Sequence, residues 1–118
     1  MEKLEGRAEA ISGEFTSQGI ASTLRAYAKM GTRPGDRLME KLEGRAEVIS
    51  GEFTSQCIAN TLWAYATMGT KPGDRLMEKL EERAEAISGE FNTEDVSETL
   101  WAYATMGRKP GERLMVLL

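Results

Sequence analysis

The chain has 118 residues, a length typical of one ordinary domain, and its balance of 41% hydrophobic and 29% charged residues is that of a globular protein. It contains no His and one Cys, which excludes an internal disulfide, a cysteine-based zinc site and the Ser-His or Cys-His pairs of nucleophilic catalysis. The 15 basic and 19 acidic side chains give a net charge of −4, and no apolar run approaches the roughly 20 residues of a membrane span.

Three copies of one 38-residue unit account for almost the whole chain. They fill residues 1–38, 39–76 and 77–114 without an insertion, and residues 115–118 open a fourth copy. A fixed period of this length is the signature of a repeat array. We therefore expect a single repeat domain over residues 1–118.

The first half of each unit predicts an amphipathic helix. Its apolar residues lie three or four positions apart, as in Leu76, Leu80, Ala84 and Ile87, while charged residues fill the positions between them. Asp36 and Asp74 precede this pattern and are expected to be its N-caps. Ser88-Gly89 is expected to end the helix, because Gly is the usual residue past a helix end.

The second half of each unit predicts a second helix. Thr54 and Asn92 are N-cap residue types, and the apolar positions that follow in the second unit are Ile58, Leu62 and Tyr65. Gly69 is expected to end this helix in a left-handed conformation, and Pro72 prevents its continuation.

One such helix pair cannot bury its apolar stripe alone, whereas stacked pairs can. The expected fold is therefore an all-α, right-handed α-solenoid of three helix-turn-helix repeats plus a C-terminal stub; the handedness is taken by analogy with other helical-hairpin arrays. The repeated core is expected to contain Leu42/Leu80, Ile49/Ile87, Ile58/Val96, Leu62/Leu100 and Tyr65/Tyr103. Met30, Met68 and Met106 are expected to fill gaps in it.

The segment Ile58–Pro72, IANTLWAYATMGTKP, resembles the octotricopeptide repeat, whose 38-residue period it shares. That family occurs in organellar gene-expression factors and stacks helix pairs to bind single-stranded RNA. The resemblance implies an RNA-binding module that reads about one nucleotide per repeat. The sequence itself leaves the location of this expected intracellular protein unknown, and only the resemblance suggests an organelle.

Differences between the repeats mark a candidate recognition stripe. The second helices of the first two units differ at positions three or four residues apart, which places them on one face opposite the apolar stripe. The candidates for RNA contact are Ser22, Arg25, Lys29, Asn60, Trp63, Thr67, Glu98 and Trp101. Two alternatives stay open: exposed positions vary freely, and the Trp residues pack in the core.

A second set of basic residues recurs once per repeat around the turn between units. Arg33, Arg37, Lys71, Arg75, Lys109 and Arg113 form a ladder that could contact a phosphate backbone. The alternative is local pairing of these residues with Asp36, Asp74, Glu112 and neighbouring Glu residues.

The sequence favours a binding module over an enzyme. Repeated carboxylates such as Glu43 and Glu47 lie on a solvated helix face, where catalytic carboxylates would lack distinct environments, and no cofactor or metal is expected. Single-stranded RNA is the leading partner. The acidic net charge favours the alternatives, which are a protein-interaction scaffold or a consensus or duplicated fragment with no ligand.

The chain ends predict self-association. Solenoids need polar caps for solubility, and none is evident beside the apolar residues near either end. We expect end-to-end contact through Met1, Leu4, Leu117 and Leu118.

Overall fold

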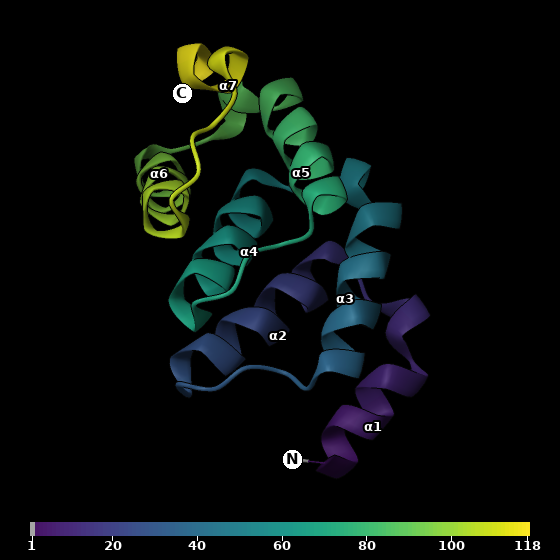
Figure 1. The fold of residues 1–118 in the computed structure, drawn as a ribbon. Coiled ribbons are helices and arrows are strands. Elements are labelled where there is room, and N and C mark those ends of the chain that lie inside the picture. Colours follow the sequence, from purple (N-terminus) through teal and green to yellow (C-terminus); the bar gives the residue numbers. More distant parts are fainter. Residues whose placement is uncertain (1) are drawn as a thin grey trace.

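Each repeat of the computed structural model consists of two α-helices joined by a 3-10 turn (Figure 1). The first helices are α1 (Glu2–Ala10), α3 (Asp36–Val48), α5 (Asp74–Ala86) and the short α7 (Glu112–Leu117). The second helices are α2 (Ser17–Lys29), α4 (Ser55–Met68) and α6 (Thr93–Met106), and the turns are η1 (Ser12–Glu14), η2 (Ser50–Glu52) and η3 (Ser88–Glu90). The structure describes residues 2–118 and the side chains of residues 5–118. Within that range no strand is present, so the all-α fold class is confirmed.

The hairpins stack so that the helices form two rows (Figure 1). In one row α4 packs extensively on both α2 and α6, whereas neighbours in the row of α1, α3, α5 and α7 touch much less. Small buried residues such as Ala21, Ala59 and Ala66 allow this close approach of the second helices. The second helices therefore form the closely packed row of the stack, and we call the surface that they present the inner face.

The second helices begin and end as the sequence predicts. The Thr54 side chain accepts a hydrogen bond from the Cys57 N–H, and Asn92 and Asp95 form a reciprocal capping box. Gly69 and Gly107 close α4 and α6 with φ of 72° and 70°, which only Gly adopts at low cost.

The predicted ends of the first helices are wrong. Helices α3 and α5 begin at Asp36 and Asp74 themselves, so the N-cap of α5 is Gly73, which has no capping side chain. The Gly73 N–H instead donates to Glu43 Oε1 at 3.2 Å, a carboxylate of the preceding first helix. Helix α5 also ends earlier than Ser88, which opens a 3-10 turn closed by a 2.8 Å bond from the Glu90 N–H to the Ile87 carbonyl.

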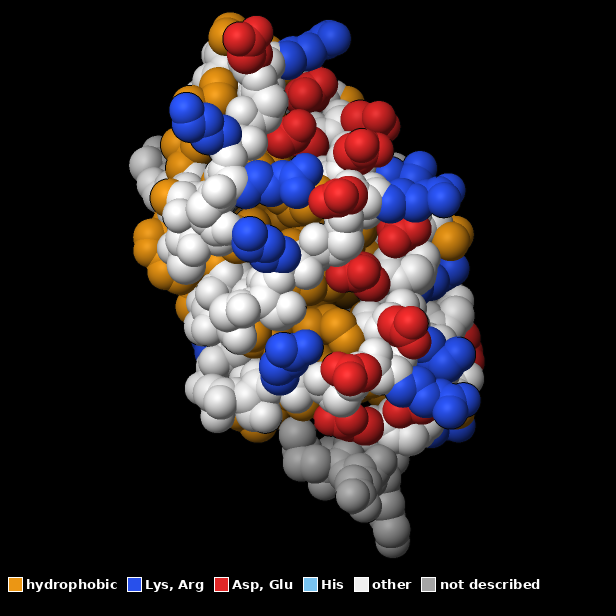
Figure 2. Space-filling model, in the orientation of Figure 1, with side chains coloured by type: hydrophobic (Ala, Val, Ile, Leu, Met, Phe, Trp, Pro, Cys, Tyr) orange, Lys and Arg blue, Asp and Glu red, His pale blue; other side chains and the backbone are white. Residues whose placement is uncertain are grey.

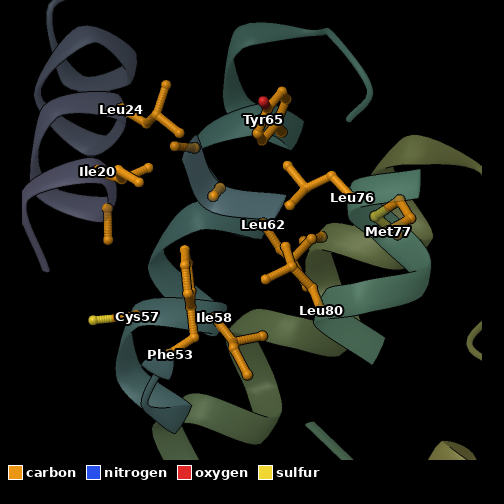
Figure 3. Packing of buried hydrophobic residues seen from close by; sticks show 14 of the residues in the cluster. Ile20, Leu24, Phe53, Cys57, Ile58, Leu62, Tyr65, Leu76, Met77 and Leu80 are labelled. Carbon is orange, nitrogen blue, oxygen red and sulfur yellow. The ribbon is translucent and has the colours of Figure 1, made fainter. Parts of the chain in front are cut away.

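The core repeats from hairpin to hairpin, as predicted for most of its members. Figure 3 shows Leu62 pointing toward Leu80 in the centre of the stack. The buried members of the predicted set are Leu42, Leu80, Ile49, Ile87, Ile58, Leu62, Tyr65 and Tyr103. Val96 is only half-buried and Leu100 is 37% exposed, contrary to prediction, because they lie on the side of α6 away from α4.

The three methionines that end the second helices are not equally buried. Met106 is buried and Met68 is half-buried, but Met30 is 58% exposed. The core prediction is therefore wrong for Met30, which lies on the side of α2 away from α4, where no described helix covers it.

Candidate nucleic-acid interface

Side chains from α4 and α6 converge on the guanidinium of Arg25, which belongs to α2. Arg25 Nη1 donates a 2.8 Å hydrogen bond to Asn60 Oδ1 and lies 3.7 Å from Glu98 Oε1. Its Cζ lies 4.5 Å from the centroid of the Trp63 ring, a cation–π contact. We call these four residues the Arg25 cluster; they are half of the residues predicted to contact RNA bases.

The Arg25 cluster spans the inner face because the second helices are close neighbours. The long Arg25 side chain reaches from α2 across α4, whose Trp63 takes the equivalent position one repeat later. The side chains of Arg25 and Glu98 are 28% and 20% exposed, so the ion pair is partly shielded from water. A phosphate would therefore compete with Glu98 for the guanidinium.

Asn60 of the Arg25 cluster lines two grooves, and Glu98 lines one of them. The groove between α2 and α4 has a volume of about 470 Å³. Hydroxyl and amide groups line it, with no charged side chain: Thr16, Ser17, Gln18, Ser22, Thr54, Gln56 and Asn60. The groove between α4 and α6, about 350 Å³, contains four carboxylates from Glu90, Glu94, Asp95 and Glu98. The two grooves lie at equivalent positions of successive repeats. The uncharged groove can accept an anion such as a phosphate, whereas the carboxylates of the other groove repel one.

The other predicted base-contact residues are more dispersed. Ser22 lines the uncharged groove, while Lys29 and Thr67 are exposed near the other ends of α2 and α4. Trp63 is half-buried and packs against the core, as the alternative interpretation proposed. Trp101, its equivalent in α6, is 46% exposed.

The predicted phosphate ladder is largely neutralised by carboxylates. Arg37, Arg75 and Arg113 each pair with a Glu of the preceding first helix, at 3.1, 3.5 and 3.8 Å, and Arg33 pairs with Asp36 at 3.8 Å. Figure 2 shows basic and acidic side chains interleaved on the side where α3 and α5 lie. Lys71 and Lys109 are exposed and form no ion pair with another described residue.

A repeated carboxylate contact was not predicted from the sequence. Glu43 accepts hydrogen bonds from the Tyr65 hydroxyl at 2.8 Å and from the Gly73 N–H at 3.2 Å. Glu5 and Glu81 make the same pair of contacts in their own repeats. We call this arrangement the Glu–Tyr–Gly clamp. It ties the first helix to the second helix and to the following loop, which gives this Glu a structural role. A buried Tyr in every repeat was the available signal, because its hydroxyl needs a partner.

The clamps raise the pKa of their tyrosines. Burial, then the hydrogen bond and negative charge of Glu5, raise the pKa of Tyr27 to about 12. Burial and the neighbouring carboxylates Glu43 and Glu81 also raise the pKa of Tyr65 and Tyr103. In each clamp the tyrosine is therefore held as the neutral hydrogen-bond donor.

These shifts predict a loss of stability at alkaline pH. An unfolded tyrosine ionises near pH 10, so the stabilisation is complete below about pH 10 and is lost as the pH rises toward the folded pKa, about 12 for Tyr27. The melting temperature should fall between pH 10 and pH 11, with pH 8 as the reference at which the stabilisation is complete, and tyrosinate absorbance should rise only as the protein unfolds. Tyr27→Phe should flatten the decrease; an unchanged decrease would contradict the contribution of this clamp.

The described part of the chain offers neither a metal site nor a membrane span. Among residues 5–118, no three carboxylate or thiol groups are arranged to hold a metal ion. No helix within residues 2–118 is long and apolar enough to cross a bilayer.

The stacked hairpins define a helical-repeat protein. Within that class, the chain belongs to the RNA-editing substrate-binding complex 6 protein family, whose family model matches residues 1–117. No individually curated protein matches the sequence. A helical, RNA-related family is thus confirmed, whereas the octotricopeptide assignment stays a prediction.

Proposed function

We propose that this chain is a non-enzymatic module that binds single-stranded RNA on the inner face formed by α2, α4 and α6. The Arg25 cluster carries the proposal, since it combines a guanidinium, an amide and an aromatic ring beside an uncharged polar groove. Such groups stack on bases, bind base edges and contact phosphates. The name of the family, which links its members to the binding of RNA-editing substrates, supports the same ligand class.

The two grooves suggest where the RNA lies. A base enters the groove between α2 and α4, where Ser22 and Asn60 offer hydrogen-bonding groups to its edge. Arg25 breaks its ion pair with Glu98 and binds the adjacent phosphate instead. The carboxylates between α4 and α6 repel a phosphate, so the first two repeats dominate binding, at about one nucleotide per repeat.

The test is the response of RNA affinity to the two charges of the Arg25 cluster. Fluorescence anisotropy with a labelled random single-stranded RNA pool at ~50 mM salt should show saturable binding. Arg25→Gln should weaken binding and reduce the salt slope by about 0.7, the value for one single-strand phosphate contact. Glu98→Gln should tighten binding by up to about fivefold, because a surface ion pair of this kind contributes at most about 1 kcal/mol.

Matched controls separate this site from the net charge. Lys41→Gln and Glu82→Gln make the same charge changes at exposed positions of α3 and α5. If each cluster variant behaves like its control, the Arg25 cluster is not the site. The absence of saturable binding to any single-stranded pool would reject RNA as the ligand.

A protein-interaction scaffold is the second candidate. The four carboxylates between α4 and α6 and the net charge of −4 favour a basic protein segment as its partner. This candidate survives if the RNA experiment fails.

A further inference from the structure

Within the chain, each hairpin uses two different faces against its neighbours. Thr61 and Ala64 of α4 are fully buried, as are Thr99 and Ala102 of α6, and these positions face the preceding hairpin. Leu24 and Leu62, 1% exposed each, instead face the following hairpin. We call these the leading face and the trailing face. Their contact joins consecutive repeats.

No described residue covers the leading face of the first repeat. Thr23 and Ala26, the equivalents of Thr61 and Ala64, are half-buried and exposed. With Phe15 and Met30 they line an apolar groove of about 360 Å³ on the side of α2 away from α4. In the second repeat the same surface is closed by the first hairpin, since Phe53 is fully buried.

The trailing face of the third repeat is likewise left uncovered by the residues that the structure describes. Leu100 and Ala104 of α6 are exposed, whereas their equivalents Leu62 and Ala66 in α4 are buried. The uncovered surface of the third repeat therefore consists of the same repeat positions as the surface of α4 that the third hairpin covers within the chain.

Polar groups at the two faces are also in register. Arg45 Nε donates to the Phe15 carbonyl, and Arg83 Nε to the Phe53 carbonyl, each at 2.9 Å. The next members of this series are the exposed Arg7 on the leading side and the Phe91 carbonyl on the trailing side. A second copy of the chain would bring those two groups together.

A second hydrogen bond repeats in the same way. Ser17 Oγ donates to the Glu52 carbonyl at 3.4 Å and Ser55 Oγ to the Glu90 carbonyl at 3.2 Å. The next donor is the Thr93 hydroxyl, and its acceptor would be the Glu14 carbonyl of a second copy. Both Thr93 and Glu14 are exposed.

We propose that two copies of this chain associate head to tail, with the leading face of one copy seated on the trailing face of the other. The junction reproduces the contact between consecutive repeats, so it is heterologous and leaves one face of each kind free for further copies. Residues 115–118 occupy the same repeat positions as residues 1–4, so these two segments compete for one place at the junction. Leu117, 44% exposed, and the half-buried Leu118 lie at this place; the side chains of Met1 and Leu4, also predicted to take part, lie outside the described residues.

The test places a charge on each face separately. Ala26→Glu alters the leading face and Ala104→Glu the trailing face, and both positions are exposed in a single chain, so the variants should fold. Sedimentation velocity over a range of concentrations should show the unmodified chain growing in mass, while each variant alone stays monomeric. An equimolar mixture of the two variants should form a dimer, because one intact leading face then meets one intact trailing face.

The matched control is Ala86→Glu, an exposed position at the end of α5 whose equivalents Ala10 and Val48 are also exposed. This variant should associate like the unmodified chain. An unmodified chain that stays monomeric at every concentration would overturn the proposal. So would association that survives either face variant, or a mixture of the two that stays monomeric.

Discussion

Leu62→Ala is expected to destabilise the fold by about 2–5 kcal/mol, the range for truncating a buried Leu. Leu62 is 1% exposed and lies in the central hairpin, where neighbouring hairpins limit collapse around the missing atoms. The loss is a large share of the 5–15 kcal/mol typical of a domain. Urea denaturation, at a protein concentration where the chain is monomeric, should show a lower midpoint with little change in slope.

The control for this substitution is built into the repeat. Leu100→Ala makes the same chemical change at the equivalent position of α6, where the side chain is 37% exposed. It should cost less than half as much, because fewer contacts are lost and water already reaches the site. Equal losses at the two positions, or a loss under about 1 kcal/mol for Leu62→Ala, would contradict the assignment of the buried face.

Features that depend on neighbouring residues were predictable from the sequence. The caps at Thr54 and Asn92 and the left-handed Gly69 follow from side chains and backbone preferences within one turn. The apolar spacing likewise identified the buried face around Leu62, and the repeat period identified the stacking. The exposed Leu100 was missed because periodicity treats every repeat alike, whereas burial depends on whether a neighbour covers it.

Features that depend on distant residues were not predictable. The N-cap prediction for Asp74 failed because the helix already begins at Asp74, and the Gly73 N–H before it is bound by Glu43, a carboxylate 30 residues before Gly73 in the chain. The recognition stripe was visible as a set of variable positions, but the ion pair between Arg25 and Glu98 requires the spacing of three helices. Repeat comparison therefore located the candidate surface without showing that its charges are paired with one another.

The Glu–Tyr–Gly clamp predicts the second large effect. Glu43→Ala removes the acceptor of both the Tyr65 hydroxyl, which belongs to a side chain only 1% exposed, and the Gly73 N–H. A buried donor left without a partner costs about 1–3 kcal/mol. Thermal or urea unfolding should show a loss in that range, whereas Glu82→Ala, at an exposed position of the same charge, should change stability by at most about 0.5 kcal/mol.

A double-mutant cycle isolates the hydrogen bond from other effects of losing Glu43. Tyr65→Phe removes the hydroxyl but leaves Glu43 bound to the Gly73 N–H, so it should cost less than Glu43→Ala. In the Tyr65→Phe background, Glu43→Ala no longer leaves a buried hydroxyl without a partner, and its cost should fall. The expected coupling is about 0.5–3 kcal/mol, the range for residues in direct contact. Strictly additive losses would show that the clamp does not stabilise the hairpin through this bond.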